Sequence, residues 1–299
     1  MVCALLASGP RQQNSDPLDN TRHCSYPMRL IFILVGLAFA PALASAQSAG
    51  PYQFPLGDTL RYHEVTRSET VIEAPQGAIP VLSEYDGIIG LAGSGEERVR
   101  AWFESLRLRA VGPNGDQSPA TTELLRKPYE LTMSPRGSVD VLATPTFPEP
   151  VAAITDLSHQ FFDFFAVMPA SPPVTGTVWQ DTIRSESATA PGTSQFNESI
   201  RHFEFRADTV VNGVPAMVIV VSAEVRTEGS APMEGQPLTV STSLKGTDTG
   251  FLIFDWAAGR LLHRSRSGEM SGVFRILGAP QPVEFPQTST YSSTIDLLR

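Results

Sequence analysis

The sequence predicts a mainly β (α+β) fold: a large curved antiparallel sheet or a partly open barrel, with one helix packed on the concave face. Segments rich in Val, Ile, Thr and Phe alternate apolar and polar residues between Pro and Gly at turn-like intervals, which is typical of successive antiparallel strands. One stretch in the middle of the chain has the apolar spacing of a helix instead. Such a helix has to bury its apolar side against the sheet.

The strands are expected at fairly regular intervals along the chain. Segment 97–111 also fits a helix, because Val99, Trp102, Phe103 and Leu106 share one helical face, but a strand is favoured. The middle of 260–276 is polar on both faces, which is typical of an edge strand or of a strand lining a wet cavity, and the edge is favoured. The expected strands are 58–73, 81–91, 97–111, 128–133, 138–143, 177–188, 199–211, 214–227, 237–246, 249–256, 260–276 and 287–298.

Three hairpins have recognisable turns. Asn212-Gly213 separates two apolar runs and favours a type I′ turn, because both central residues of that turn need a positive φ. Ser134–Gly137 and Trp256–Gly259 each place Gly at the end of a turn between two expected strands. All three patterns predict antiparallel neighbours.

The expected helix follows Pro150 and carries an aromatic stripe. Its apolar positions fall on one face, and Pro169 ends it. The stripe is expected to pack against the sheet, and the alternative is that it lines a cavity, because four phenylalanines within five residues exceed what a minor helix needs for packing. The apolar face consists of Ile154, Leu157, Phe161, Phe164, Phe165 and Met168.

The N-terminal region reads as a targeting segment. Met28–Ala46 has Arg29, then a short apolar run and the ending Ala44-Ser45-Ala46, which predicts a secretory signal peptide at 28–46. Residues 1–27 form a polar leader that we interpret as a mis-called N-terminal extension. Residues 47–299 are expected to form a single mainly β domain, because no break in composition divides them.

Charge and cysteine content narrow the range of partners. The formal charge is −9, and 1–46 holds three Arg against two Asp, so the remainder carries −9 − 1 = −10. An acidic surface argues against nucleic acid as a partner. Both cysteines, Cys3 and Cys24, precede the expected cleavage site, so neither a lipid anchor nor a disulfide is expected afterwards. We therefore expect a periplasmic or secreted protein without stable membrane insertion.

The chain lacks the sequence patterns of common catalytic and metal sites. It has no G-x-S-x-G, H-E-x-x-H, P-loop or G-x-G-x-x-G pattern, and its histidines are isolated. We accordingly predict no catalytic residue, no metal ligand and no cofactor. His202 and Glu204, on one face of a strand, are the only candidates for an acid and base pair, and a solvated strand face explains them more simply.

Two motifs give the chain a likeness to a known group of proteins. Phe165-Ala-Val-Met-Pro169 is followed by Pro173-Val-Thr-Gly176-Thr-Val-Trp179, and a Val-Asn-Gly hairpin comes later. Together with the signal peptide, this pattern resembles a family of exported bacterial β proteins classed as a domain of unknown function. The resemblance covers Gly57–Leu297 in outline and implies a turn at Gly176 and a core position for Trp179. More distantly, the arrangement is similar to the lipoprotein-carrier class, whose half-barrel sheet encloses an apolar cavity under helices.

These observations lead to three functional hypotheses. The first is a non-catalytic envelope protein that binds an apolar small molecule or a lipidated envelope protein between sheet and helix, with ligand contacts from Phe161, Phe162, Phe164, Phe165 and Trp179. The second is a structural or interaction module that pairs through a sheet edge, such as strand 214–227 or 260–276. The third is a hydrolase whose residues converge from distant strands.

Overall fold

The computed structural model describes residues 51–298, apart from 55, 96, 114, 189–191, 234–236, 279–280 and 282. The chain divides into two units, Met1–Ser45 and Ala46–Arg299, and all described residues belong to the second. The predicted leader, 1–27, and the predicted signal peptide, 28–46, lie outside the described residues. Among the residues described, no helix is both long and apolar enough to cross a membrane.

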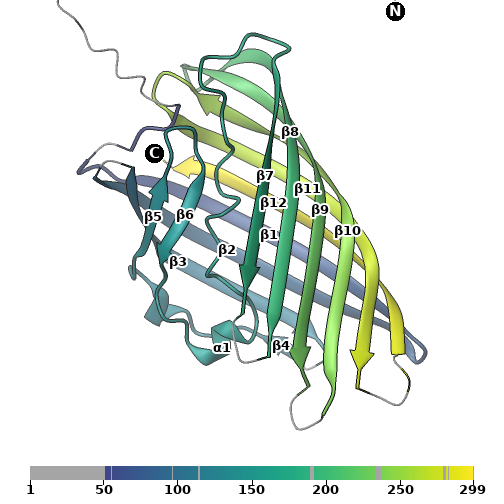
Figure 1. Ribbon diagram of the computed structural model, residues 1–299. Coiled ribbons are helices and arrows are strands. Elements are labelled where there is room, and N and C mark those ends of the chain that lie inside the picture. Colours follow the sequence, from purple (N-terminus) through teal and green to yellow (C-terminus); the bar gives the residue numbers. More distant parts are fainter. Residues whose placement is uncertain are drawn as a thin grey trace, which may run out of the picture. The chain divides into compact units, whose positions relative to one another are not determined.

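A single large antiparallel sheet dominates the structure, so the predicted mainly β class is confirmed (Figure 1). The strands lie in the order β6-β5-β3-β2-β1-β12-β11-β10-β9-β8-β7, and β4 pairs with β3. The first and last long strands are neighbours, with Arg61 opposite Leu298. Within the described chain, β6 and β7 are the two margins, and no pairing between them closes the sheet. The strands are β1 Leu60–Ala74, β2 Gly77–Gly95, β3 Arg98–Gly112, β4 Gly115–Gln117, β5 Tyr129–Met133, β6 Val139–Ala143, β7 Val178–Ser187, β8 Ser194–Val211, β9 Val214–Pro232, β10 Thr239–Asp255, β11 Arg260–Leu277 and β12 Val283–Leu298.

The predicted hairpins form as expected. Asn212 and Gly213 have φ values of 53° and 84°, as a type I′ turn between β8 and β9 requires. Gly137 and Gly259 also have positive φ and end the β5–β6 and β10–β11 turns. Segment 97–111 is strand β3, as favoured. The two strands predicted at 237–246 and 249–256 are one continuous strand, β10, because neither Gly246 nor Gly250 breaks the pairing with its neighbours.

The prediction of an edge strand at 260–276 is wrong, since β11 is paired with β10 on one side and β12 on the other. A bulge explains the misleading pattern. Ile253 is opposite His263 while Phe254 is opposite Leu261, so Leu262 has no partner. The bulge places Leu261 and Arg264 on the same buried face, although they are three residues apart. Arg264 and Arg266 of β11 therefore face the concave interior, while His263 lies on the opposite face beside Asp296.

The predicted long helix after Pro150 does not form. The only α-helix in the described chain is α1, Glu149–Ala152, and Thr122–Leu124 is a 3-10 turn. Residues 153–169 follow as successive turns with i to i−3 bonds, such as Gln160 N–H to Leu157 C=O. At the start of these turns, Ser158 N–H donates a hydrogen bond to the side chain of Asp156, two residues earlier, and this local bond competes with helix formation. The predicted helix on the concave face is thus replaced by a segment of turns, which we call the connecting segment (149–169).

Side chains of the sheet, of the residues before β1 and of the β5–β6 turn stabilise this irregular backbone. They donate hydrogen bonds to six consecutive carbonyl oxygens, those of residues 163–168, and so replace the amide partners that a helix would supply. Tyr129 Oη donates to a seventh, that of Leu157, at 3.1 Å. Because the partners come from both margins of the sheet, the segment bridges them. The donors to residues 163–168 are Arg264, Arg201, Tyr52, Trp179 and Arg136.

The aromatic side chains of the segment form the centre of the core. Phe161, Phe164 and Phe165 are at most 1% exposed. Phe161 packs edge-to-face on Tyr129, with ring centroids 4.9 Å apart, and Phe164 does so on Tyr62 at 5.4 Å. Burying side chains of this size is among the largest contributions that single residues make to a core.

Candidate functional site

The inner face of the sheet has two dissimilar halves. In the packed half, the connecting segment and its aromatic residues cover the strands. In the open half, which we define as 66–83, 194–200, 225–232, 239–246, 268–277 and 283–291, the strands continue toward the β7–β8, β9–β10 and β11–β12 turns (Figure 1). Its inner positions carry mainly small residues, among them Thr70, Ser289 and Gly272. A face lined by small side chains leaves room that large ones would fill.

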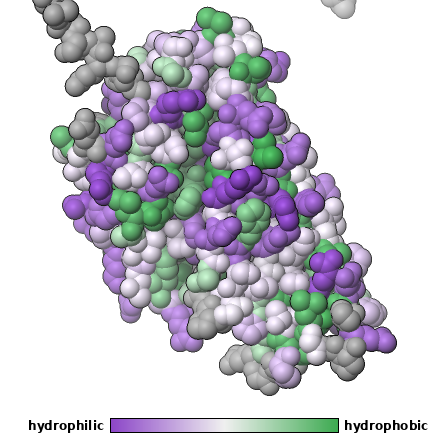
Figure 2. All heavy atoms as spheres, in the orientation of Figure 1, coloured by the Kyte–Doolittle hydropathy of each residue, from purple (hydrophilic) through white to green (hydrophobic). Residues whose placement is uncertain are grey.

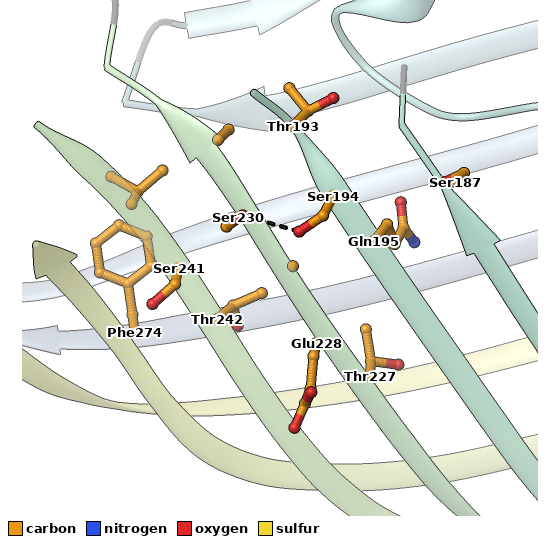
Figure 3. A pocket seen from close by; sticks show the side chains of 13 residues that line it. Ser187, Thr193, Ser194, Gln195, Thr227, Glu228, Ser230, Ser241, Thr242 and Phe274 are labelled. Carbon is orange, nitrogen blue, oxygen red and sulfur yellow. Dashed lines mark hydrogen bonds between the residues drawn. The ribbon is translucent and has the colours of Figure 1, made fainter. Parts of the chain in front are cut away.

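A cavity of about 390 Å³ lies in the open half (Figure 3). Alternation along β8, β9 and β10 places Gln195, Thr227 and Thr242 on the same sheet face as the buried Phe203, Ile219 and Leu252. The cavity therefore opens on the concave side. Its lining residues are Ser187, Thr193, Ser194, Gln195, Thr227, Glu228, Gly229, Ser230, Ala231, Val240, Ser241, Thr242 and Phe274.

The lining combines hydroxyl and amide groups with apolar surface. On the concave side, Thr242 donates to Gln287 at 2.8 Å. Ser194 and Ser230, at the alternate positions of β8 and β9, hydrogen-bond to each other at 2.8 Å on the opposite face. Phe274 supplies a ring at one side of the cavity (Figure 3). The described lining includes one carboxylate, Glu228, which pairs with Arg226, and no Lys or Arg. Hydroxyls both donate and accept, so these walls suit a neutral polar group beside an apolar one.

A second hollow, of about 670 Å³, lies behind the same strands. It shares Gln195, Gly229 and Thr242 with the first cavity, while Phe196 and Arg275 belong to this second hollow alone. Gly229 contributes no side chain to either one. A Cβ atom there would lie 3.3 Å from Thr242 Cγ2 and 3.6 Å from the Ser194 carbonyl oxygen, so a small substitution would narrow the site with only ordinary van der Waals contact to the backbone.

Three of the predicted ligand-binding residues lie deep in the core. Phe161, Phe164 and Phe165 contact one another and the sheet, whereas Phe162 is half-buried beside His159. Trp179 is also half-buried: its ring stacks on Phe203 at 5.4 Å and its Nε1 donates to Val167 C=O. The structure thus gathers the first three residues and sets the other two apart from them. Gly176 has a φ of 86° in a turn, as the resemblance implied.

The candidate acid and base pair does not form a site of its own. His202 is exposed, and Glu204 pairs with Arg206 at 2.9 Å. Both border a shallow cavity of about 420 Å³ that also includes Trp179. Within the described ranges, no group of three or more His, Cys, Asp or Glu side chains could hold a metal ion.

A buried charged cluster joins the connecting segment to the sheet. Arg201 on β8 contacts Asp163 and Asp181, each at 2.5 Å. Arg266 on β11 contacts Asp163 and Asp248, and Tyr291 donates to Asp248. Burial alone would raise the pKa of Asp163, but Arg266, Arg201 and Arg264 outweigh it and hold that pKa well below its usual range. The three arginines thus keep Asp163 ionised.

Glu64 on β1 lies beside this cluster but has a different environment. It is 5% exposed and accepts a hydrogen bond from Gln160 Nε2 at 2.6 Å. Its nearest recorded guanidinium nitrogen, Arg264 Nη2, is 4.0 Å away. Burial raises the pKa of Glu64 to about 7, although Arg264 and Gln160 oppose that rise.

The outer side chains of several strands carry ion pairs. Arg109 contacts both Glu84 and Asp116, and Arg100 contacts Glu130. Figure 2 shows hydrophilic residues over much of the visible face, with hydrophobic ones interspersed. The sheet-edge hypothesis loses the strands on which it was based, because β9, like β11, is paired on both sides.

Comparison with known proteins gives little further guidance. No family model matches the chain, and no curated protein sequence matches it. Among solved structures, Neisserial surface protein A has 8% identity and a TM-score of 0.23 over 80% of this chain and 97% of that one. OccK2 of Pseudomonas aeruginosa has 8% identity and a TM-score of 0.22 over 82% and 100%. Likenesses this distant carry no argument, and the similarity to the lipoprotein-carrier class finds no support among them.

The sequence interpretation missed the open half as a site. Its inner positions are spread over seven strands, β1, β2 and β8 to β12, and each strand contributes only a few small residues. The usable signal was that small or polar residues interrupt the inner positions of these strands, such as Thr242 and Gly246 on β10, Gly268 and Gly272 on β11 and Ser289 on β12, where a packed sheet would carry Val, Ile or Leu.

Proposed function

We propose that the protein is a non-catalytic exported envelope protein that binds a neutral amphiphile, an apolar chain with an uncharged polar head, in the open half of the sheet. The cavity of about 390 Å³ is the observation that carries the proposal. Its volume falls within the roughly 300–1,000 Å³ of small-molecule sites. A lipidated partner would use the same site by inserting its acyl chain.

The chemistry of the lining selects the ligand class. Val240, Ala231 and Phe274 offer apolar contacts for a chain, while the hydroxyls of Thr227 and Thr242 on the concave side offer donors and acceptors for a head group. By the alternation of β9, Glu228 and its partner Arg226 point to the opposite face, so the side chains on the concave side of the described lining are uncharged. An ionised head group would lose its hydration there without gaining a counter-ion, whereas a hydroxyl or an ester would find hydrogen-bond partners. The predicted ligand is therefore closer to a monoacylglycerol than to a fatty acid.

Only two of the five predicted aromatic ligand contacts remain in the proposal. A ligand can reach Phe162 and Trp179 without disturbing the core, whereas Phe161, Phe164 and Phe165 would have to leave their packing. We therefore expect Phe162→Ala to weaken binding only if the chain extends from the open half to the connecting segment.

Native mass spectrometry of the protein exported by a bacterial host and purified without detergent tests binding directly. We expect a co-purifying lipid-sized mass, and monoacylglycerol to bind at least tenfold more tightly than the fatty acid of the same chain. Gly229→Leu, which extends into the cavity, should abolish binding. The control, Glu224→Leu, lies on the exposed face of the same strand and should leave binding unchanged. A bare polypeptide mass, with no binding of either lipid, would refute the proposal.

Export is tested separately. N-terminal sequencing of the protein recovered from the envelope should begin at Gln47, and Ala46→Arg should block cleavage and leave a heavier product. Recovery of an unprocessed chain from the cytoplasm would contradict export while leaving the binding site open to test.

A further inference from the structure

The position of the connecting segment depends on contacts to the sheet more than on its own backbone. It contains one turn of α-helix, and its carbonyl oxygens between 163 and 168 accept hydrogen bonds from side chains of the sheet and of the β5–β6 turn. Segments held in this way open separately from the rest of a protein when one of their contacts fails. Glu64 provides such a contact, through Gln160.

The charges near Glu64 are already balanced without it. Three arginines lie near three aspartates. Arg201 contacts Asp163 and Asp181, and Arg266 contacts Asp248. Arg264 instead donates a hydrogen bond to the backbone carbonyl of Asp163. Arg264 donates from Nη1 to the Asp163 and Phe164 carbonyls, which leaves Nη2 at 4.0 Å from Glu64. A buried carboxylate without a close cation is costly, and it becomes less costly if water reaches it.

We propose that Glu64 is a proton-operated latch for the connecting segment: with its proton, the carboxyl stays buried against Gln160 and the segment stays docked, and without it the segment opens to let water reach the carboxylate. The groups that face Glu64 are Arg264 on β11, Tyr85 on β2, and Gln160 and Asp163 on the segment. Asp163 remains ionised across the relevant range, because its own pKa is held low. The switching charge is therefore that of Glu64.

The direction of the effect follows from linkage. A buried acid whose pKa is about 7 when docked and 4.5 when exposed favours the docked form at low pH and loses that advantage as the pH rises through 7. The ratio of open to docked segment should then increase on the order of 100-fold between pH 5 and pH 8. Global unfolding need not follow, since the strands retain their own pairing.

Hydrogen exchange of the full exported chain, followed by mass spectrometry and corrected for the intrinsic pH dependence of exchange, tests the latch. Peptides from 153–169 should lose protection between pH 5 and pH 8, while peptides from the buried centre of β9, 216–223, should not. Glu64→Gln keeps the hydrogen-bonding shape without the charge, so it should hold the segment protected at both pH values. Asp86→Asn, which removes an exposed carboxylate paired with His63, should behave as the wild type.

Three results would overturn the proposal. They are unchanged protection of 153–169 between the two pH values, a pH effect that survives in Glu64→Gln, and an equal loss of protection in β9, which would make Glu64 a determinant of global stability instead of a latch. Fluorescence of Trp179, whose indole donates to Val167 C=O, gives a second reading of docking that does not depend on peptide coverage.

Discussion

The two halves of the concave face differ in the size of the side chains that line them. In the packed half, large side chains such as Tyr62, Phe103 and Phe164 fill the interior to the point where they are at most 1% exposed. In the open half, Thr70 on β1 and Ser289 on β12 occupy equivalent inner positions and hydrogen-bond across the strands at 3.0 Å instead. The same strands thus carry a core at one end and a hollow at the other.

This difference shows that the sheet is longer than its core requires. Strands of 15–19 residues continue past the connecting segment, although a half-filled sheet buries less apolar surface per residue. Extra strand length that does not contribute to the core is most simply explained by the space it encloses. The packed half should therefore determine stability, and the open half should determine binding.

The largest expected contrast is between two phenylalanines. Phe164→Ala should destabilise the fold by about 3–5 kcal/mol, because it leaves a cavity among packed aromatic rings. Phe274→Ala, at the cavity in the open half, should cost less than about 1 kcal/mol, because Phe274 keeps partial exposure there. Urea unfolding measures both. Equal losses would mean that the open half is part of the core.

Removing a charged side chain should likewise destabilise the fold more in the packed half than in the open half. Arg266→Met removes the cation from Asp248 and one of the cations from Asp163, so we expect a loss of about 3–5 kcal/mol. Arg226→Met removes a half-exposed partner of Glu228 at the rim of the cavity and should cost at most about 1 kcal/mol. A small effect of Arg266→Met in urea unfolding would show that the connecting segment docks through its aromatic residues alone.

Much of this architecture could be predicted from sequence because the strands alternate strictly. Eleven of the twelve strands coincide with expected segments, and Asn212-Gly213 forms the expected turn. The exception, β4, has three residues, too few for any alternation to show. The bulge at Leu262 was hidden as well, because a single unpaired residue reverses the apparent face of everything after it.

The connecting segment could not be predicted in the same way. The apolar spacing of Leu157, Phe161 and Phe165 identified residues that do become buried, but the same spacing suits consecutive turns. What decided against a helix was the supply of side-chain donors such as Arg264 on β11 and Arg201 on β8, which come from strands distant in sequence. Burial was therefore predictable from local pattern, and backbone conformation was not.

The smallest expected effects come from two glycines of the open half, which are small for different reasons. A Cβ on Gly246 would lie 1.9 Å from the Glu269 carbonyl oxygen, so Gly246→Ala forces the backbones of β10 and β11 apart and should cost about 1–3 kcal/mol. A Cβ on Gly229 would lie 3.3 Å from a methyl group of Thr242 and at an ordinary contact distance of 3.6 Å from the Ser194 carbonyl oxygen, so Gly229→Ala should change stability by no more than about 0.5 kcal/mol.

The loss of ligand affinity should have the opposite order, larger for Gly229→Ala than for Gly246→Ala. Gly229→Ala narrows the cavity itself and should weaken monoacylglycerol binding several-fold at nearly unchanged stability, whereas Gly246 does not line the cavity, and its variant should lose stability without a matching loss of affinity. Urea unfolding and lipid titration of the two variants, measured side by side, give the comparison. If Gly229→Ala left the affinity unchanged, the small residues of the open half would serve strand packing alone, and the cavity would have no part in binding.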